Sequence, residues 1–191
     1  MRITGGELKG RIVNVPSGVI RPAMDRMRES VFACLGDIAG LSFLDIFSGS
    51  GIIALEAASR GACPVETVEQ DKLKRKTLLE NVSISPYRIN CRFMPAELYV
   101  KRAKTAFDII FLDPPFPYQF KWELVTKIAE SNLVKTGTKV LIHRPSQDYL
   151  KNEIPNLEKI DSREYGRSIV DFFSVRSVPP CKEAASATSS M

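Results

Sequence analysis

The stretch LSFLDIFSGSG, residues 41–51, decides the fold. Its first seven residues are mostly apolar and predict a buried strand, and Gly49 and Gly51 then predict a tight turn. The next residues, IIALEAASRGA (52–62), predict a short helix closed by Gly61. A strand that feeds a helix through a turn is the pattern that the rest of the chain repeats.

Strand-like and helix-like runs alternate along the sequence. The expected strands are residues 41–47, 64–69, 89–94, 107–112 and 138–143, and then two strands within 157–175 around a turn at 165–166. The expected helices are residues 24–36, 52–62, 71–84, 96–104 and 118–131. Because the central strands are nearly all apolar, we expect the α/β class, with a mostly parallel seven-stranded sheet, helices on both faces and antiparallel pairing at one edge.

Three segments follow from this pattern. Residues 1–23 contain two early glycines and a Val-x-Val near Pro16, and predict a β-hairpin arm outside the sheet. Residues 24–175 form the α/β domain. Residues 176–191 are small and polar and are expected to be disordered.

The composition argues against several classes of protein. No apolar run approaches the roughly 20 residues that span a bilayer, and the first residues lack the apolar segment of a signal peptide, so we expect a cytoplasmic protein without membrane contact. The four cysteines form no CxxC pair, which favours free thiols. The only histidine, His143, argues against a His-based metal site and against Ser-His-Asp or Cys-His catalysis. We expect no metal, and we interpret His143 as a satisfied residue at a strand end.

Positive charge is concentrated in two parts of the chain, whose net charge is +5. Residues 1–30 hold six basic residues against three acidic ones, and residues 72–104 hold nine against two. Such clusters are often only solvated faces. Together with the motifs below, we interpret them as the footprint of a nucleic acid.

The motif DIFSGSG, residues 45–51, predicts one half of a ligand site. Gly49 and Gly51 let the backbone approach a ligand, and Glu69, at the end of the next strand, is placed to accept hydrogen bonds from ribose hydroxyls. The spacing also fits NAD, because Gly49-x-Gly51-x-x-Ala54 satisfies the dinucleotide pattern. Asp45 would repel a pyrophosphate but could bind an ammonium group, which favours S-adenosylmethionine.

The motif LDPPF, residues 112–116, predicts the other half. A nucleobase amine is a poor nucleophile because its lone pair is delocalised into the ring. The Asp113 carboxylate and the Pro114 carbonyl, held rigid by Pro115, could each accept one amine N–H and so direct the lone pair towards a methyl donor. Phe116 could stack on a base swung out of its helix. The amine proton then passes to Asp113 or to water.

The motifs FSGSG, VEQD and LDPPF resemble those of S-adenosylmethionine-dependent amino-methyltransferases of class I. The segments MRITGGELKGR (1–11) and RPAMDRMRESVF (21–32) narrow the resemblance to the bacterial 16S ribosomal RNA guanine-N2 methyltransferase family, over residues 1 to about 175. It implies a Rossmann-like methyltransferase fold, S-adenosylmethionine as cofactor, and 16S ribosomal RNA, free or in an assembling small subunit, as partner. The alternatives are a DNA adenine or cytosine amino-methyltransferase, an NAD-binding oxidoreductase and a non-catalytic RNA-binding module.

The resemblance also assigns residues to the site. The catalytic residues it implies are Asp113, Pro114, Pro115 and Phe116. The cofactor-binding residues it implies are Asp45, Phe47, Gly49, Ser50, Gly51, Glu69, Gln70 and Ala96, the last through its backbone N–H because Pro95 replaces a usual polar residue. The RNA-binding residues it implies are Lys9, Arg11, Arg21, Arg26 and Arg28, and Asp25 and Glu29 would help to close the site. His143-Arg144-Pro145 departs from the acids usual after the fifth strand, which would alter RNA contacts.

Overall fold

The computed structural model describes residues 1–15, 24–149 and 153–176. Arg21 and residues 177–191 of the expected tail lie outside this part. The helical elements are α1 (Met24–Leu35), α2 (Ile52–Ser59), the 3₁₀ turn η1 (Lys72–Lys74), α3 (Arg75–Val82), α4 (Ala96–Arg102) and α5 (Lys121–Ala129). The strands are β1 (Phe43–Ile46), β2 (Val65–Val68), β3 (Ile89–Arg92), β4 (Ile109–Leu112), β5 (Lys139–Pro145), β6 (Leu157–Tyr165) and β7 (Ser168–Val175).

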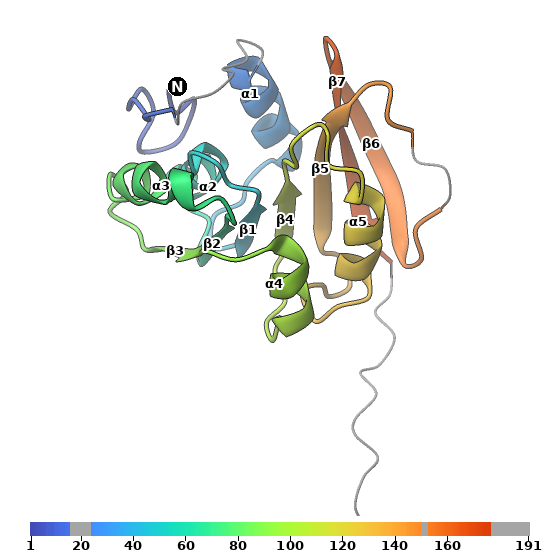
Figure 1. Cartoon of the computed structure of the whole chain (residues 1–191). Coiled ribbons are helices and arrows are strands. Elements are labelled where there is room, and N and C mark those ends of the chain that lie inside the picture. Colours follow the sequence, from blue (N-terminus) through green and yellow to red (C-terminus); the bar gives the residue numbers. More distant parts are fainter. Residues whose placement is uncertain (16–23, 150–152, 177–191) are drawn as a thin grey trace, which may run out of the picture.

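The strands form one seven-stranded sheet in the order β3-β2-β1-β4-β5-β7-β6 (Figure 1). The first five strands pair in parallel, and β7 pairs antiparallel with both β5 and β6. Strand order therefore reverses direction between β1 and β4, and the carboxyl ends of these two strands open onto a crevice. The predicted Rossmann-like sheet is confirmed.

Alternating side chains of each strand enter two separate cores. Phe43, Ile109 and Phe111 face one core, which α1 and α2 cover. Leu44 and Ile110 face the other, which α4 and α5 cover. The helices thus lie on both faces of the sheet, as predicted, and Figure 1 shows α4 and α5 in front of the strands.

The expected elements are present, but most are shorter than the sequence pattern indicates. The helix expected over 71–84 is divided into η1 and α3, and Asp71 caps η1 by accepting a hydrogen bond from the Leu73 N–H. Some apolar residues beyond the strands, such as Phe107, are also buried in the core and so extend the apolar runs.

The arm of residues 1–15 folds back on itself and packs firmly on the domain. An isolated antiparallel bridge joins Arg2 and Ile12, and the buried side chains of Ile3, Leu8 and Val13 belong to the core beneath α1 and α2. The arm lies outside the sheet, as expected, yet it shares the core of the domain.

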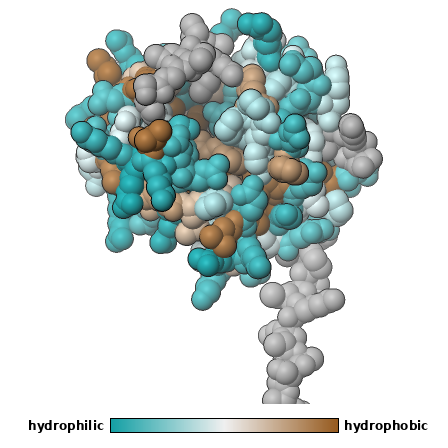
Figure 2. Space-filling model, viewed as in Figure 1, coloured by the Kyte–Doolittle hydropathy of each residue, from teal (hydrophilic) through white to brown (hydrophobic). Residues whose placement is uncertain are grey.

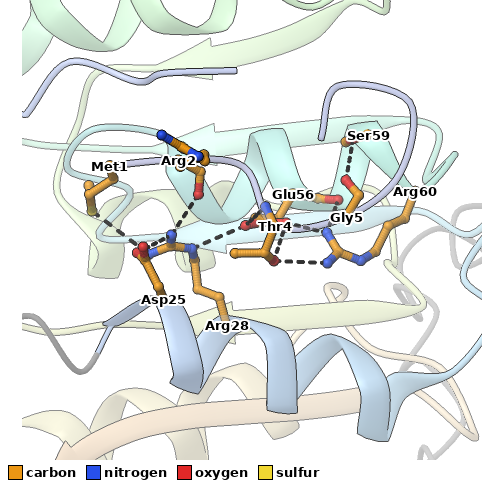
Figure 3. Close-up of polar contacts among 9 residues, drawn as sticks. All are labelled: Met1, Arg2, Thr4, Gly5, Asp25, Arg28, Glu56, Ser59 and Arg60. Atoms are coloured by element: carbon orange, nitrogen blue, oxygen red, sulfur yellow. Dashed lines mark hydrogen bonds and ion pairs between the residues drawn. The ribbon is translucent and has the colours of Figure 1, made fainter. Parts of the chain in front are cut away.

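A buried ion pair holds the arm, α1 and α2 together (Figure 3). Nε of Arg28 lies 3.2 Å from Oε1 of Glu56, and both side chains are fully buried. The Thr4 N–H donates to the same Glu56 carboxylate at 2.8 Å, and Arg60 also pairs with it. Arg28 further binds Asp25 at 2.6 Å and the Arg2 carbonyl at 2.9 Å.

The assignment of Arg28 to RNA binding is therefore wrong. Its side chain has no exposed surface, and its guanidinium N–H groups are used by the two carboxylates and the arm backbone. A buried guanidinium needs such partners to offset the loss of hydration. Arg28 anchors the arm instead.

No helix in the described part of the chain is both long and apolar enough to cross a lipid bilayer.

Figure 2 shows a largely hydrophilic face with apolar patches near its centre.

Candidate active site

The strand register brings the ends of β1, β4 and β5 to one level. Ile46 pairs with Leu112, and Leu112 pairs with Ile142. The residues that come next in the chain are Phe47 after Ile46, Asp113 after Leu112 and His143 after Ile142. These three residues therefore lie side by side at the carboxyl edge of the sheet. This row forms the floor of the site.

A cavity of about 630 Å³ opens above this row. Ligand pockets of a few hundred cubic ångströms are typical for small-molecule sites, and the carboxyl edge of a parallel sheet is their usual place. The lining residues come from the arm, the glycine loop, the β2–η1 connection and the turns after β4 and β5; they are Met1, Val15, Phe47, Gly49, Glu69, Gln70, Asp71, Lys74, Asp113, Pro114, Pro115, Phe116 and His143.

A second cavity, of about 640 Å³, lies at the opposite edge of the sheet. Ser42, Pro64 and Asp108, which precede β1, β2 and β4, line it. The two predicted motifs are both absent from its walls. We therefore place the site at the carboxyl edge.

The two predicted halves of the site meet in the first cavity. Phe47, Gly49, Glu69 and Gln70 of the cofactor set line it together with the whole Asp113–Phe116 segment. Because β4 lies next to β1, residues more than 60 positions apart in sequence share one pocket.

Asp45 lies in β1, and its carboxylate is buried without a partner. The residue is 1% exposed, and within the described part of the chain neither carboxylate oxygen has a hydrogen-bond donor. Burial, then the nearby charge of Asp113 and, to a smaller extent, that of Glu69 raise the pKa of Asp45 to about 8, and the Ala54 N–H and the Ser48 hydroxyl partly oppose this rise. A buried carboxylate without a donor is poised to pair with a cation.

Glu69 is held rigidly at the end of β2. Its Oε2 accepts the Gly49 N–H at 2.8 Å, and its Oε1 accepts the Asp71 N–H at 2.8 Å. Each carboxylate oxygen has a second lone-pair site, so this side chain can still accept hydrogen bonds from ligand hydroxyls. Lys74 lies 3.8 Å away and balances part of the charge.

The two glycines of the loop have different roles. A Cβ at Gly49, whose φ is +55°, would meet nothing closer than 4.0 Å, so the backbone faces open space at the cavity. A Cβ at Gly51 would lie 2.5 Å from Cδ1 of Leu78. The expectation that Gly51 gives a ligand close access is thus corrected: Gly51 lets α2 pack against α3.

Phe47 adopts a left-handed backbone conformation, with φ of +66°. This conformation is strained for an aromatic residue and is often found at functional sites. It places the ring 5.3 Å from that of Tyr118, which follows the Pro-Pro turn. The β1 turn and the DPPF turn are thereby joined by an aromatic contact.

The DPPF turn is fixed at both ends. The Asp113 N–H donates to the Ile46 carbonyl at 3.1 Å, and the Tyr118 N–H donates to the Pro115 carbonyl at 2.8 Å. Pro114 is buried, whereas Phe116 is partly exposed at the cavity wall. A carboxylate, a rigid carbonyl and an aromatic ring therefore follow one another along the same wall.

His143 is the main functional candidate that sequence reasoning missed. Its Nδ1 lies 2.8 Å from Oδ1 of Asp113, and its ring meets that of Phe116 edge-on at 5.7 Å. The interpretation of His143 as a residue satisfied at a strand end is wrong, because its buried Nε2 has no partner among the described residues. Its position at the end of the strand next to DPPF was the available signal.

Four residues of the predicted cofactor set do not line the cavity: Asp45, Ser50, Gly51 and Ala96. Ser50 is buried, and its carbonyl accepts a hydrogen bond from Nδ2 of Asn81 at 2.8 Å. The Ala96 side chain packs in the core beneath α4. Contact between its backbone N–H and the cofactor stays a prediction. Glu29 lines a separate hollow beside Arg60, not this site.

The basic residues of the arm lie on the surface. Lys9 and Arg11 are exposed, and so is Arg26 on α1. Arg144 is not available to RNA in this structure, because it is buried and paired with Asp171. The cavity lining also includes Met1, Val15, Asp71 and Lys74, which were not among the predicted site residues.

Comparison with known proteins agrees with this architecture. A family model described as "Conserved hypothetical protein 95" matches residues 1–174. Ribosomal RNA small subunit methyltransferase D of Escherichia coli is 36% identical over 120 residues, which are 61% of this chain but only 60% of that protein's length. The protein of the same description from Haemophilus influenzae is 31% identical over 74% of this chain and 77% of its own.

Solved structures extend the likeness to nearly the whole chain. The E. coli protein yhhF superposes with a TM-score of 0.84 at 26% identity, covering 93% of this chain and 98% of its own. A Thermus thermophilus protein, TTHA0928, superposes with a TM-score of 0.78 at 30% identity, covering 93% and 99%.

Proposed function

This chain belongs to the family described as conserved hypothetical protein 95, and from that premise we propose that it is an S-adenosylmethionine-dependent methyltransferase acting on 16S ribosomal RNA. The finer proposal is that the acceptor is the exocyclic N2 amine of one guanine. The observation that supports it most is the shared cavity, in which the glycine loop faces the DPPF turn.

The residues present fit S-adenosylmethionine. When bound, this cofactor supplies a methyl group on a positively charged sulfur, and its amino-acid end carries an ammonium group. The unpartnered Asp45 carboxylate suits the ammonium, and Glu69, held by two backbone N–H groups, suits the ribose hydroxyls. NAD fits less well, because the Asp45 carboxylate would repel its pyrophosphate.

The DPPF turn suits a planar amine. Asp113 would accept one amine N–H and the Pro114 carbonyl the other, which draws the nitrogen lone pair out of conjugation and towards the methyl group. As the amine nitrogen gained the methyl group and the methyl–sulfur bond broke, Asp113 or water would take the amine proton. Phe116 would hold the base plane by stacking.

Ribosomal RNA is favoured over DNA by the relatives of this chain. Several of them, including those from Escherichia coli and Haemophilus influenzae, are described as ribosomal RNA small subunit methyltransferases. Lys9 and Arg11 on the arm and Arg26 on α1 are exposed and would be free to contact RNA phosphates.

Mass spectrometry of ribosomal RNA from cells with and without this protein tests the proposal. We expect one guanine to lose its N2-methyl group when the gene is deleted and to regain it when the gene is restored. Loss of a methyl group from a ribosomal RNA adenine would contradict only the finer proposal, the guanine N2 acceptor. Loss of a methyl group from DNA, or no loss from any nucleic acid, would contradict the whole proposal. Calorimetry adds a second check: S-adenosylmethionine should bind, and NAD should not.

A further inference from the structure

His143 has one polar partner among the described residues, and that partner is the proposed catalytic carboxylate. The side chain is 3% exposed, and the 2.8 Å contact from its Nδ1 to Oδ1 of Asp113 follows from the parallel register of β4 and β5. Phe116 packs edge-on against the same ring. Asp113 and Phe116, two members of the DPPF wall, are thus both fixed by His143.

We assign the proton on the imidazole ring from the chemistry of this contact. With Asp113 as an ionised carboxylate, which only accepts hydrogen bonds, Nδ1 carries the proton and donates it to Asp113. In the neutral ring Nε2 is then an acceptor, and it is buried with no donor in the described part of the chain. An unpaired buried acceptor lowers stability, so this arrangement is poorly explained by a purely structural role.

The nearby charged groups in the described part of the chain leave the Nδ1 contact to Asp113 alone. Asp45 lies close enough to interact with Asp113, whereas the neighbouring Arg144 points to the other face of the sheet and pairs with Asp171. On the α5 side, Lys121 pairs with Asp148. The described groups therefore leave His143 as the donor to Asp113.

We propose that His143 is a positioning residue for Asp113. By holding Oδ1, it leaves Oδ2 as the oxygen that accepts the target amine N–H, and it prevents the carboxylate from rotating away from the cavity. This inference rests on the proposed methyl transfer, but its central contact can be measured without any activity.

Nuclear magnetic resonance provides the direct measurement. The chain has a single histidine, so the ¹⁵N spectrum of imidazole-labelled protein contains one ring. At pH 8 we expect the Nδ1–H tautomer, and we expect Asp113→Ala to shift it towards Nε2–H, the form that free imidazole side chains favour. An Nε2–H ring in the wild type would overturn the proposal.

Three substitutions then separate positioning from packing. His143→Asn places an amide N–H where Nδ1 lies, His143→Gln places it near Nε2 instead, and His143→Leu has no donor. We expect the His143→Gln and His143→Leu variants to have single-turnover methylation rates on the order of 10- to 100-fold below that of the wild type. The His143→Asn variant should retain most of the wild-type rate. Affinity for S-adenosylhomocysteine should not change, and Leu should unfold at the same or higher denaturant concentration.

The outcomes distinguish this inference from the proposed function. If wild-type protein transfers no methyl group to RNA, the proposed function is wrong and the inference falls with it. The wild type could instead be active while the His143→Gln variant has the same methylation rate, or while the His143→Asn variant is as slow as the His143→Leu variant. In either case only the proposed role of His143 is wrong.

Discussion

At the scale of single residues, the site is defined by acidic groups held in different ways. Asp45 is buried without a donor, Glu69 is held by two backbone N–H groups, and Asp113 is held by one imidazole. These environments give similar side chains different roles. The first suits a cation, the second suits hydroxyl donors, and the third suits an amine.

Asp113→Ala should reduce the methylation rate by a hundredfold or more, because the amine then lacks the carboxylate that redirects its lone pair. Affinity for S-adenosylhomocysteine should be nearly unchanged, since Glu69 and Gly49 are intact. Single-turnover kinetics and calorimetry on the same samples measure the two quantities. Unchanged turnover would show that the lone-pair argument is wrong.

Asp45→Asn should stabilise the cofactor-free protein in a pH-dependent manner. The folded-state pKa of Asp45 is about 8, far above its usual 3.8, so wild-type stability falls as pH rises from about 4 to about 8. The Asn variant lacks this loss. Measured by urea unfolding, the free energy of unfolding of Asp45→Asn should equal that of the wild type at pH 4 and exceed it by at most about 4 kcal/mol at pH 7. The affinity of the variant for S-adenosylmethionine should be lower than that of the wild type.

Asp108→Asn is the matched control with the opposite sign. Although partial burial opposes it, hydrogen bonds from Lys135 and Ser42 lower the pKa of Asp108 to about 2. This carboxylate therefore contributes stability above about pH 4 that is lost as pH falls towards 2. The control variant should be less stable than wild type at pH 7. If Asp45→Asn and Asp108→Asn both stabilised the protein at pH 7, the different environments of the two carboxylates would not explain their effects on stability.

At the scale of elements, the arm is joined to the domain by close backbone approach as well as by charge. The Glu7 N–H donates to the Ser59 carbonyl at 2.7 Å, and the Ser59 hydroxyl donates to the Gly5 carbonyl at 2.6 Å. Breaking a buried ion pair such as Arg28–Glu56 usually costs about 3–5 kcal/mol. The arm should therefore unfold together with α1 and α2.

Gly6→Ala should detach the arm from α2. A Cβ at Gly6 would lie 1.8 Å from the Ser59 carbonyl oxygen, and the φ of +73° is already unfavourable for alanine. We expect a loss of at least about 2 kcal/mol in urea unfolding, together with faster hydrogen exchange in residues 1–15.

Gly10→Ala separates strain from collision. Gly10 has a similar φ of +87°, but a Cβ there meets nothing within 4 Å. Its loss should be about 1 kcal/mol, without faster exchange in the rest of the arm. Equal effects of the two substitutions would show that the arm does not depend on this contact.

The elements were predictable from the sequence because apolar runs and glycines act locally. The contacts between elements were not. Arg28 was misassigned because its partner Glu56 lies 28 residues away, and only the docking of α1 on α2 makes the pair. The role of His143 likewise depends on the register of two parallel strands, which the sequence does not state.

At the scale of the whole molecule, the docked arm would set the geometry of the proposed RNA binding. Met1 and Val15 line the cavity, while Lys9 and Arg11 lie exposed on the same arm. A fixed arm presents its charges at a constant position relative to Asp113. RNA phosphates bound there would be held in register with the target base.

Reversing both charges, with Lys9→Glu and Arg11→Glu, should weaken RNA binding and flatten its dependence on salt. Each phosphate contact to single-stranded RNA releases roughly 0.7 counterions, so the slope of log K against log salt should decrease by about 1.4 or more. The control is Arg163→Glu with Arg176→Glu, which changes net charge equally at exposed sites on β6 and just after β7. Because β6 is at the far edge of the sheet from β1 and β2, this control should leave the slope nearly unchanged. Equal slopes for both double variants would mean that the overall charge, and not the arm, attracts the RNA.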